Sequence, residues 1–286
     1  MTSINTNVSA MTALQSLSMI NSSLDQTQNR ISTGFRVGAA SDNAAYWSIA
    51  TTMRSDNKAL GAVEDALGLG QAKVDTAYTG MKAAIDVVDE MKSKLVAARE
   101  PGVDRSKIQA ELKELQGQLT SIATSASFSG ENWLSVDSSD ASYTATKSVV
   151  SSFNRASDGT TVSVSTIDID ITSTELFDAN DQSGVLDTEF TTTGGGNVTV
   201  SVSNLDITTT GVTDLDINQM ISSVDGAIQS MTTAASNLGA AKSRMDIQSE
   251  FVSNLRDSIE KGVGTLVDAD MTEESTRLKA LQTQQQ

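Results

Sequence analysis

The chain has 286 residues and a formal net charge of −16, from 20 lysine and arginine residues against 36 aspartate and glutamate residues. It has no cysteine and no histidine, which excludes disulfides, thiolate nucleophiles and the side chain that most often acts as a general base or transition-metal ligand. The negative charge disfavours nucleic acid and anionic membranes as partners, because both carry phosphate. We therefore expect no catalytic residue, no metal and no cofactor.

The N-terminus does not have the pattern of a secretory signal, since residues 1–13 have neither a basic region nor a continuous apolar run. No stretch of the chain approaches the ~20 apolar residues that a membrane span needs. We expect a protein that stays in the cytosol or is exported by a route that needs no cleaved signal. The single proline, Pro101, is compatible with long uninterrupted helices.

Residues 1–33 predict an amphipathic helix whose polar face is unusual. The apolar residues recur at steps of three and four, with one longer gap: Ile4, Val8, Met11, Leu14, Leu17, Ile20, Leu24 and Ile31. The other face is almost uncharged before Asp25 and is built from Asn, Ser, Thr and Gln, which form helices poorly. We interpret this segment as one that becomes ordered between subunits. The alternative is a frayed helix that docks on its own domain.

Residues 34–42 predict a connector between two helices. Gly34 and Gly38 interrupt the first helix, and either Ser41 or Asp42 is expected to cap the next one. The glycine spacing fits neither a dinucleotide-binding nor a nucleotide-binding loop, and no strand precedes it, so we reject a phosphate site. Residues 1–42 are expected to form one N-terminal region.

Residues 43–136 predict a long helix followed by a second, shorter one. Every seventh position is large and apolar: Met53, Leu60, Leu67, Val74, Met81, Val88 and Leu95. The companion positions three residues later are small or apolar, Gly70 among them, and should let a second helix approach closely. After Pro101, the pair Ser106 and Gln109 has the spacing of a capping box, and a 4-3 apolar pattern then continues to about Ser127.

Residues 137–212 predict a β-rich insertion with polar outer faces. Apolar residues alternate in two stretches, around Val162–Ile171 and Val198–Val202, and a phase shift at Ser165–Thr166 indicates a β-bulge. Paired aspartates in this region do not fit an EF-hand loop, so we interpret them as solvated loops rather than a calcium site. A glycosidase is disfavoured because few apolar or aromatic residues are available to line a sugar cleft.

Residues 213–264 predict the return helix, which Asp216 and Gln219 are expected to cap. Its heptad positions are again all apolar: Ile217, Val224, Met231, Leu238, Met245, Val252 and Ile259. Together with the first heptad series, they predict a mainly α fold. Its core is a long antiparallel coiled-coil rod, formed by the N- and C-terminal segments around the β-rich inserted domain. We call these two heptad series the seam.

Residues 265–286 predict a last short helix, capped by Asp270 and Glu273 and carrying Leu278 and Leu281. No residue with the properties of a helix stop follows, so we expect the helix to be interrupted at Gln286. The two terminal helices bring apolar stripes to one end of the rod, where the rods leave no partner for them apart from each other. Exposed stripes of this kind are typical of chains that assemble with copies of themselves.

Several motifs, in the same order along the chain, resemble those of bacterial flagellins. The sequence of residues 30–45 (RISTGFRVGAASDNAA) is similar to the N-terminal flagellin signature, and Asn5-Thr6-Asn7 precedes it as in that family. Phe128-Ser129-Gly130 followed by Trp133-Leu134 resembles the turn after the third helix. Residues 238–245 (LGAAKSRM) and 267–271 (VDADM) resemble the C-terminal part. The resemblance covers about residues 1–135 and 215–286.

The resemblance implies a secreted, extracellular structural subunit of the bacterial flagellar filament, used for swimming. It implies that identical or closely related subunits form a helical homopolymer. Further implied partners are the flagellar type III export apparatus, a cytoplasmic chaperone and the filament cap, with no nucleic acid and no membrane. The terminal helices would form the inner tube, the rods the next shell, and the insertion the outer surface. Arg30, Gly34, Arg36 and Asp42 would belong to the spoke between the helices.

Other functions remain open at this stage. Flagellins usually continue through a further amphipathic helix beyond the point that corresponds to Gln286. A hook–filament junction protein shares the same terminal helices, and an adhesin would use the Ser/Thr-rich insertion to bind surfaces. An enzyme is the third class.

Overall fold

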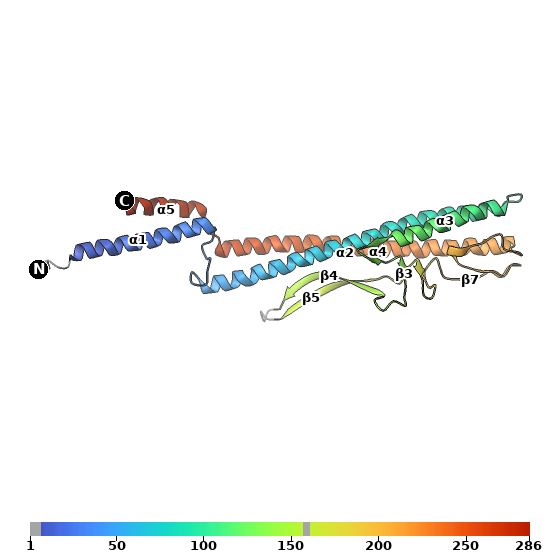
Figure 1. Ribbon diagram of the computed structural model, residues 1–286, viewed down its shortest axis with the longest axis horizontal. Helices are drawn as coiled ribbons and strands as arrows, with labels where there is room; N and C mark the ends of the chain where they lie inside the picture. Colours follow the sequence, from blue (N-terminus) through green and yellow to red (C-terminus); the bar gives the residue numbers. More distant parts are fainter. Residues whose placement is uncertain (1–6, 157–160) are drawn as a thin grey trace. The chain divides into compact units, whose positions relative to one another are not determined.

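The computed structural model describes residues 7–156 and 161–286, which divide into two compact units (Figure 1). Of the described residues, 7–62 and 252–286 form the terminal unit, and 63–156 and 161–251 form the middle unit. The helices are α1 (Val8–Thr33), α2 (Ala44–Ala97), α3 (Arg105–Ser125), α4 (Asp214–Val267) and α5 (Met271–Gln285). In the described ranges, no helix has an apolar run long enough to cross a bilayer.

The strands all lie between α3 and α4. They are β1 (Ser127–Phe128), β2 (Glu131–Asn132), β3 (Ser135–Val136), β4 (Thr146–Arg155), β5 (Val162–Asp170), β6 (Phe177–Asp178), β7 (Phe190–Thr191) and β8 (Thr199–Val200). A short 3₁₀ helix, η1, follows at Val202–Asn204. The pairs β1–β2, β4–β5 and β7–β8 are antiparallel, whereas β3–β6 is parallel. The fold is thus mainly helical with a β-rich middle region, which confirms the predicted fold class.

The core of the middle unit follows the seam. In this unit the seam residues of both helices are buried, and none is more than 1% exposed: Leu67, Val74, Met81, Val88, Leu95, Ile217, Val224, Met231, Leu238 and Met245. Ion pairs Lys92–Asp225 and Lys242–Asp75 link the two helices. Because the residue numbers rise on α2 as they fall on α4, the helices are antiparallel. The α3 residues Ile108, Leu112 and Leu119 are also buried.

The seam is less covered in the terminal unit. Leu60 and Val252 are buried, but Met53 and Ile259 are only partly buried. These two residues pack on a small cluster of Val37, Ala50, Val263 and Val267.

The predicted caps of three helices are wrong, because another residue stands at the start of each helix. Asp104 caps α3 by accepting a hydrogen bond from the Ser106 N–H, 3.0 Å away. Gln109 instead binds the backbone of Leu205 and Ile207.

Thr213, rather than Asp216, precedes α4, and Gln219 bonds to Thr193. Likewise Asn43, not Ser41 or Asp42, caps α2 by accepting from the Tyr46 N–H. Gln109 and Gln219 are engaged by residues distant in sequence, whereas Asp42 accepts hydrogen bonds from the nearby N–H groups of Gly38 and Ala39. Asp270 does cap α5, as predicted.

The predicted β-bulge exists, but its extra residue lies on the other strand. The register between β4 and β5 shifts between Val150 and Ser152, opposite Thr166 and Ser165, so Ser151 is the inserted residue. Since β5 itself runs without interruption, Val162 and Val164 point away from the buried side chains of Ile167 and Ile169 and are exposed.

Two glycines of α2, Gly70 and Gly80, lie against segments other than a second long helix. A Cβ at Gly70 would lie 2.5 Å from Val149 of β4, and one at Gly80 would lie 2.7 Å from Leu134. The small position at Gly70, predicted to admit a helix, therefore admits a strand.

Candidate assembly surface of the terminal helices

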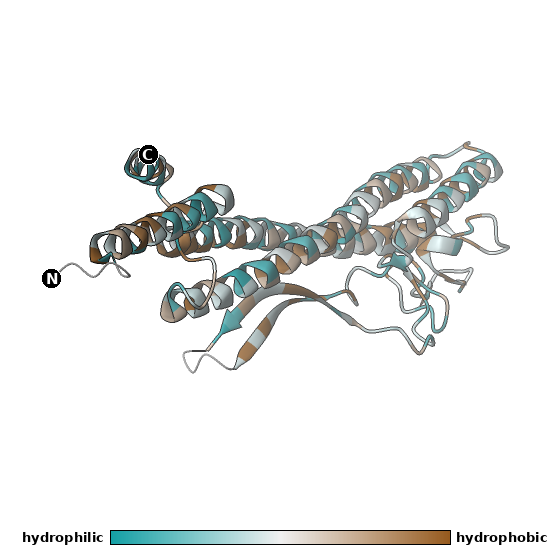
Figure 2. Ribbon diagram, turned by 60° about the vertical axis from the view of Figure 1, so that its left-hand side comes forward, coloured by the Kyte–Doolittle hydropathy of each residue, from teal (hydrophilic) through white to brown (hydrophobic). Residues whose placement is uncertain are grey.

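Helix α1 begins with a side-chain cap and exposes most of its apolar stripe. The Asn7 Oδ1 accepts hydrogen bonds from the N–H groups of Ser9 and Ala10, which satisfies two free donors of the first turn. The first four large apolar residues of the described helix are between 40% and 74% exposed: Val8, Met11, Leu14 and Leu17. Figure 2 shows hydrophobic residues recurring along this helix. Ile4, predicted as part of the stripe, lies outside the described residues.

Helix α5 covers the second half of the stripe. Leu24 is buried, Ile20 and Ile31 are partly buried, and Leu278 and Leu281 of α5 are partly buried. The Gln285 side chain donates to Asn21 Oδ1 at 2.7 Å, at the C-terminal end of α5. The large apolar side chains of α1 from Val8 to Met19 are exposed. The predicted contact residues thus divide into a set covered within the chain and a set open to solvent.

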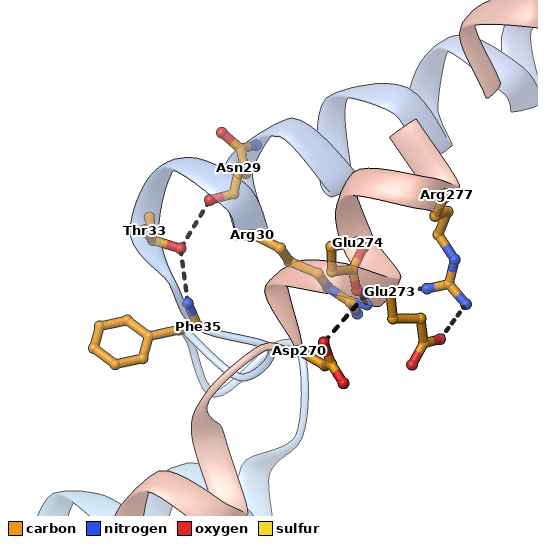
Figure 3. Close-up of polar contacts among 8 residues, drawn as sticks. All are labelled: Asn29, Arg30, Thr33, Phe35, Asp270, Glu273, Glu274 and Arg277. Carbon is orange, nitrogen blue, oxygen red and sulfur yellow. Dashed lines mark hydrogen bonds and ion pairs between the residues drawn. The ribbon is translucent and has the colours of Figure 1, made fainter. Parts of the chain in front are cut away.

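A charged pair joins the two helices at the start of α5 (Figure 3). The Arg30 guanidinium binds Glu274 Oε1 at 3.0 Å, and the Glu274 side chain is only 6% exposed. Arg277 lies 3.5 Å from the same carboxylate and also binds Glu273 at 3.4 Å. The sequence identified Arg30 but not Glu274, although Glu274 sits one position after the expected capping pair. A buried carboxylate needs a cation, and this requirement explains the position of Arg30.

The two connectors between the terminal helices and the rods pair with each other. Gly34 ends α1 with a φ of 76°, a left-handed conformation that glycine adopts at little cost, and its N–H donates to the Arg30 carbonyl. Its own carbonyl accepts from Ala269 at 2.9 Å, next to an antiparallel bridge between Phe35 and Asp268. The segments before α2 and after α4 are therefore held side by side by backbone hydrogen bonds.

Arg36 binds the free carbonyls at the C-terminus of α4. The Arg36 Nη2 donates to the Leu266 carbonyl at 3.0 Å, and the Arg36 backbone N–H donates to the Val267 carbonyl at 2.7 Å. The last carbonyls of a helix have no partner within it and carry partial negative charge, so a guanidinium stabilises them. Asp42 holds the other end of the connector, where its Oδ2 accepts from the N–H groups of Gly38 and Ala39, each at 3.0 Å.

This arrangement organises helix ends and leaves an apolar surface open to solvent. The described parts of the chain contain no group of three acidic side chains placed to hold a metal ion. What the geometry offers is an uncharged, exposed apolar stripe next to a pair of braced connectors, which suits binding to another surface rather than chemistry.

Comparison with known proteins decides the family. The model of the bacterial flagellin N-terminal helical region matches residues 4–139, and that of the bacterial flagellin C-terminal helical region matches residues 221–286. The chain belongs to the bacterial flagellin family. It is 54% identical to flagellin C of Rhizobium meliloti strain 1021, in an alignment that covers all of this chain and 93% of the relative.

Two further flagellins show the same full-length similarity. Flagellin A of the same Rhizobium strain is 46% identical, with 95% of its length covered, and a flagellin of Brucella melitensis biotype 1 is 45% identical, with 92% covered. In both, the alignment spans this whole chain. As a flagellin, the protein is a structural, non-enzymatic subunit of the extracellular flagellar filament used for motility, and it self-assembles.

Proposed function

We propose that the α1–α5 pair makes the innermost contact between copies of this flagellin in the filament. The residues that carry this contact are Ile4, Val8, Met11, Leu14, Leu17, Ile20, Leu24, Ile31, Leu278 and Leu281. Exposure of the stripe from Val8 to Leu17 supports the proposal, because water-exposed apolar surface is stabilised when a partner covers it. The absence of charge on α1 before Asp25 adds support, since identical acidic chains repel one another elsewhere.

This proposal assigns each part of the chain to a layer of the filament. Residues 1–42 and 265–286 form the inner layer, 43–136 and 213–264 the rod layer, and 137–212 the outer, water-facing part. Arg30, Gly34, Arg36 and Asp42 act as the spoke that joins the inner layer to the rod. Their hydrogen bonds to α5, to the second connector and to the end of α4 support this role.

The same proposal assigns partners before assembly. The export apparatus takes the unfolded chain, a cytoplasmic chaperone protects the C-terminal segment, and the filament cap receives the subunit. Large apolar residues exposed on a monomer support the need for a chaperone, because such surfaces aggregate when left free.

The test is seeded polymerisation followed by negative-stain electron microscopy. Purified protein is mixed with sheared filament fragments, beside a sample that lacks residues 1–42. We expect filaments from the first and none from the second, because the deletion removes the exposed stripe.

Point variants test the apolar stripe of α1 without removing the rest of residues 1–42. Leu14→Asn with Leu17→Asn should abolish elongation, whereas Ser16→Asn with Ser18→Asn on the same helix should not. Equal elongation of both variants would contradict the proposal. Soluble helical monomers from every sample, the unaltered protein included, would favour the junction or adhesin alternative.

A further inference from the structure

The methionines of this chain divide into an exposed group and a buried group. The chain has ten methionines and no cysteine, so methionine is its only sulfur-containing residue. Met11 and Met19 of α1 are 61% and 60% exposed, and Met271 of α5 is 45% exposed. We call these three the exposed methionines. Met53 is partly buried, and Met1 lies outside the described residues. The other five lie on α2 and α4 and are completely buried: Met81, Met91, Met220, Met231 and Met245.

Helix α5 leaves Met11 and Met19 exposed because they lie on the opposite side of α1. Leu24 is buried where α5 covers α1. At about 100° per residue, Met11 and Met19 each lie about 140° around the helix from Leu24. The described part of this chain therefore leaves both side chains open to small solutes, even where α5 runs beside α1.

A methionine that small solutes can reach is oxidised by hydroperoxides such as hydrogen peroxide. The thioether sulfur attacks one peroxide oxygen with a lone pair, so that a sulfur–oxygen bond forms while the oxygen–oxygen bond breaks. The sulfur loses two electrons, the peroxide gains them, and its second oxygen leaves as water with both protons. The product is a sulfoxide, which turns a flexible apolar side chain into a polar one. Because the chain has no cysteine, no thiol of its own competes for the peroxide.

We propose that the exposed methionines are oxidation sites, and that their sulfoxides prevent a free subunit from joining the filament. The proposal rests on the proposed function, in which a neighbouring copy covers the α1–α5 pair, and adds to it regulation by oxidation. A sulfoxide oxygen that becomes buried in an apolar contact without a hydrogen-bond donor destabilises that contact. A subunit that has already been added is protected, since its neighbours cover the same side chains.

The first experiment locates the oxidised residues. Free subunits and finished filaments are treated with the same concentration of hydrogen peroxide, catalase stops the reaction, and tandem mass spectrometry of tryptic peptides finds each added oxygen atom. We expect oxidation of the exposed methionines in free subunits before any of the five buried ones, and slower oxidation of the exposed methionines in filaments. Equal rates for the two groups, or equal rates in subunits and filaments, would overturn the proposal.

The second experiment measures the critical concentration for seeded elongation with oxidised subunits. We expect it to rise about tenfold or more, because every copy would bury polar groups in place of thioethers. Methionine sulfoxide reductases A and B, supplied with dithiothreitol, should restore the original value, since each enzyme reduces one epimer of the sulfoxide. No rise after oxidation, or a rise that the two reductases do not reverse, would overturn the proposal.

Matched variants connect the loss of elongation to particular methionines. One variant is Met11→Leu, Met19→Leu, Met271→Leu, and its control is Met220→Leu, Met231→Leu, Met245→Leu; leucine is close to methionine in volume. For each protein, the critical concentration after oxidation is divided by its own value before oxidation. This ratio should be near one for the first variant and as high as the parent's for the control, and equal ratios would overturn the proposal.

The proposed function and this inference fail in different ways. If the untreated, unaltered protein forms no filaments from seeds, the proposed function itself fails. If the untreated protein elongates and the fully oxidised protein elongates equally well, only the inference about oxidation is overturned.

Discussion

At the scale of single residues, the polar groups that organise this protein act through partners far away in sequence. Arg30 reaches Glu274, Arg36 reaches Leu266, and Gln109 reaches Leu205. Each satisfies a carboxylate or a backbone group that would otherwise be buried or at a helix end without a partner. The contact of Gln109 with Leu205 explains why the Gln109 side chain takes no part in the cap of α3.

Replacing Glu274 tests the bond between α1 and α5. Glu274→Ala leaves the Arg30 guanidinium without its buried partner and should lower the local stability of α5 by about 1–3 kcal/mol. Hydrogen exchange of residues 271–285 would report the loss as faster exchange. Glu273→Ala is the matched control, because its exposed carboxylate pairs with Arg277 at the surface and should cost about 0.5 kcal/mol or less. Equal protection in the two variants would argue against a structural role for the Arg30 pair.

We predict that the stability of the middle unit falls at acid pH because of Asp216. Hydrogen bonds from the Thr192 and Thr213 hydroxyls, together with the Thr213 and Gly196 N–H groups, hold the pKa of Asp216 well below its usual range. Because the pKa is lower in the folded protein, the stability it contributes is present above the unfolded-state pKa of about 4 and declines as pH falls below it.

Asp216→Asn should therefore lower the midpoint of urea unfolding at pH 7 and flatten the loss of stability below about pH 4. Chemical unfolding followed by circular dichroism across pH 3–7 measures both effects. Asp214→Asn serves as the control, since Asp214 is exposed and binds Arg105 at the surface. If the stability of the Asp216→Asn variant fell below about pH 4 as steeply as that of the parent protein, the acid sensitivity would not come from Asp216.

At the scale of elements, the glycines of α2 show where other chain segments press on the helix. Gly80 lies under Leu134 and Ala126, whereas at Gly68, twelve residues earlier on the same helix, an added Cβ would have no atom within 4 Å. The same substitution therefore has opposite consequences at the two sites.

Gly80→Ala should destabilise the middle unit by about 1–3 kcal/mol, because the added methyl group would lie 2.7 Å from Leu134 and 2.9 Å from Ala126. Gly68→Ala should stabilise it by about 0.5–1 kcal/mol through helix propensity alone. Thermal or urea unfolding of the two variants measures the difference. A stabilising effect at Gly80 would mean that Leu134 moves aside without cost.

At the scale of the whole molecule, charge opposes the assembly that apolar surface favours. The net charge of −16 acts between all neighbouring copies, while several segments, the beginning of α1 among them, carry no charged side chain. Salt reduces the repulsion over a distance of about 10 Å at 0.1 M and leaves apolar contacts in place.

Seeded elongation should therefore become faster as sodium chloride rises from about 0.01 to 0.15 M, because the Debye length shortens from about 30 to 8 Å. Turbidity or light scattering gives the rate, and sucrose at equal osmolality controls for general solution effects. A rate independent of salt would contradict the prediction, because it would show that repulsion between acidic residues of neighbouring copies does not limit elongation.

Periodicity in the sequence predicted the long helices, the antiparallel seam and a β-rich region between them. This succeeded because a heptad of large apolar residues has one stable solution, burial against a second such series. Residues 30–45 and the C-terminal motifs were enough to indicate the flagellin family. The apolar stripe of α1 could be predicted for the same reason as the seam, since its spacing is local.

Only the tertiary structure decided which polar residues meet and which apolar residues stay uncovered. Glu274 opposite Arg30, Ser151 as the bulged residue and Val149 over Gly70 each depend on segments that are distant in sequence. A local pattern specifies which face of an element is apolar, but it does not specify where the partner element ends. Tyr46 shows this limit: it stands one heptad before Met53 and so follows the seam pattern, yet α4 stops at Val267 and Tyr46 is exposed.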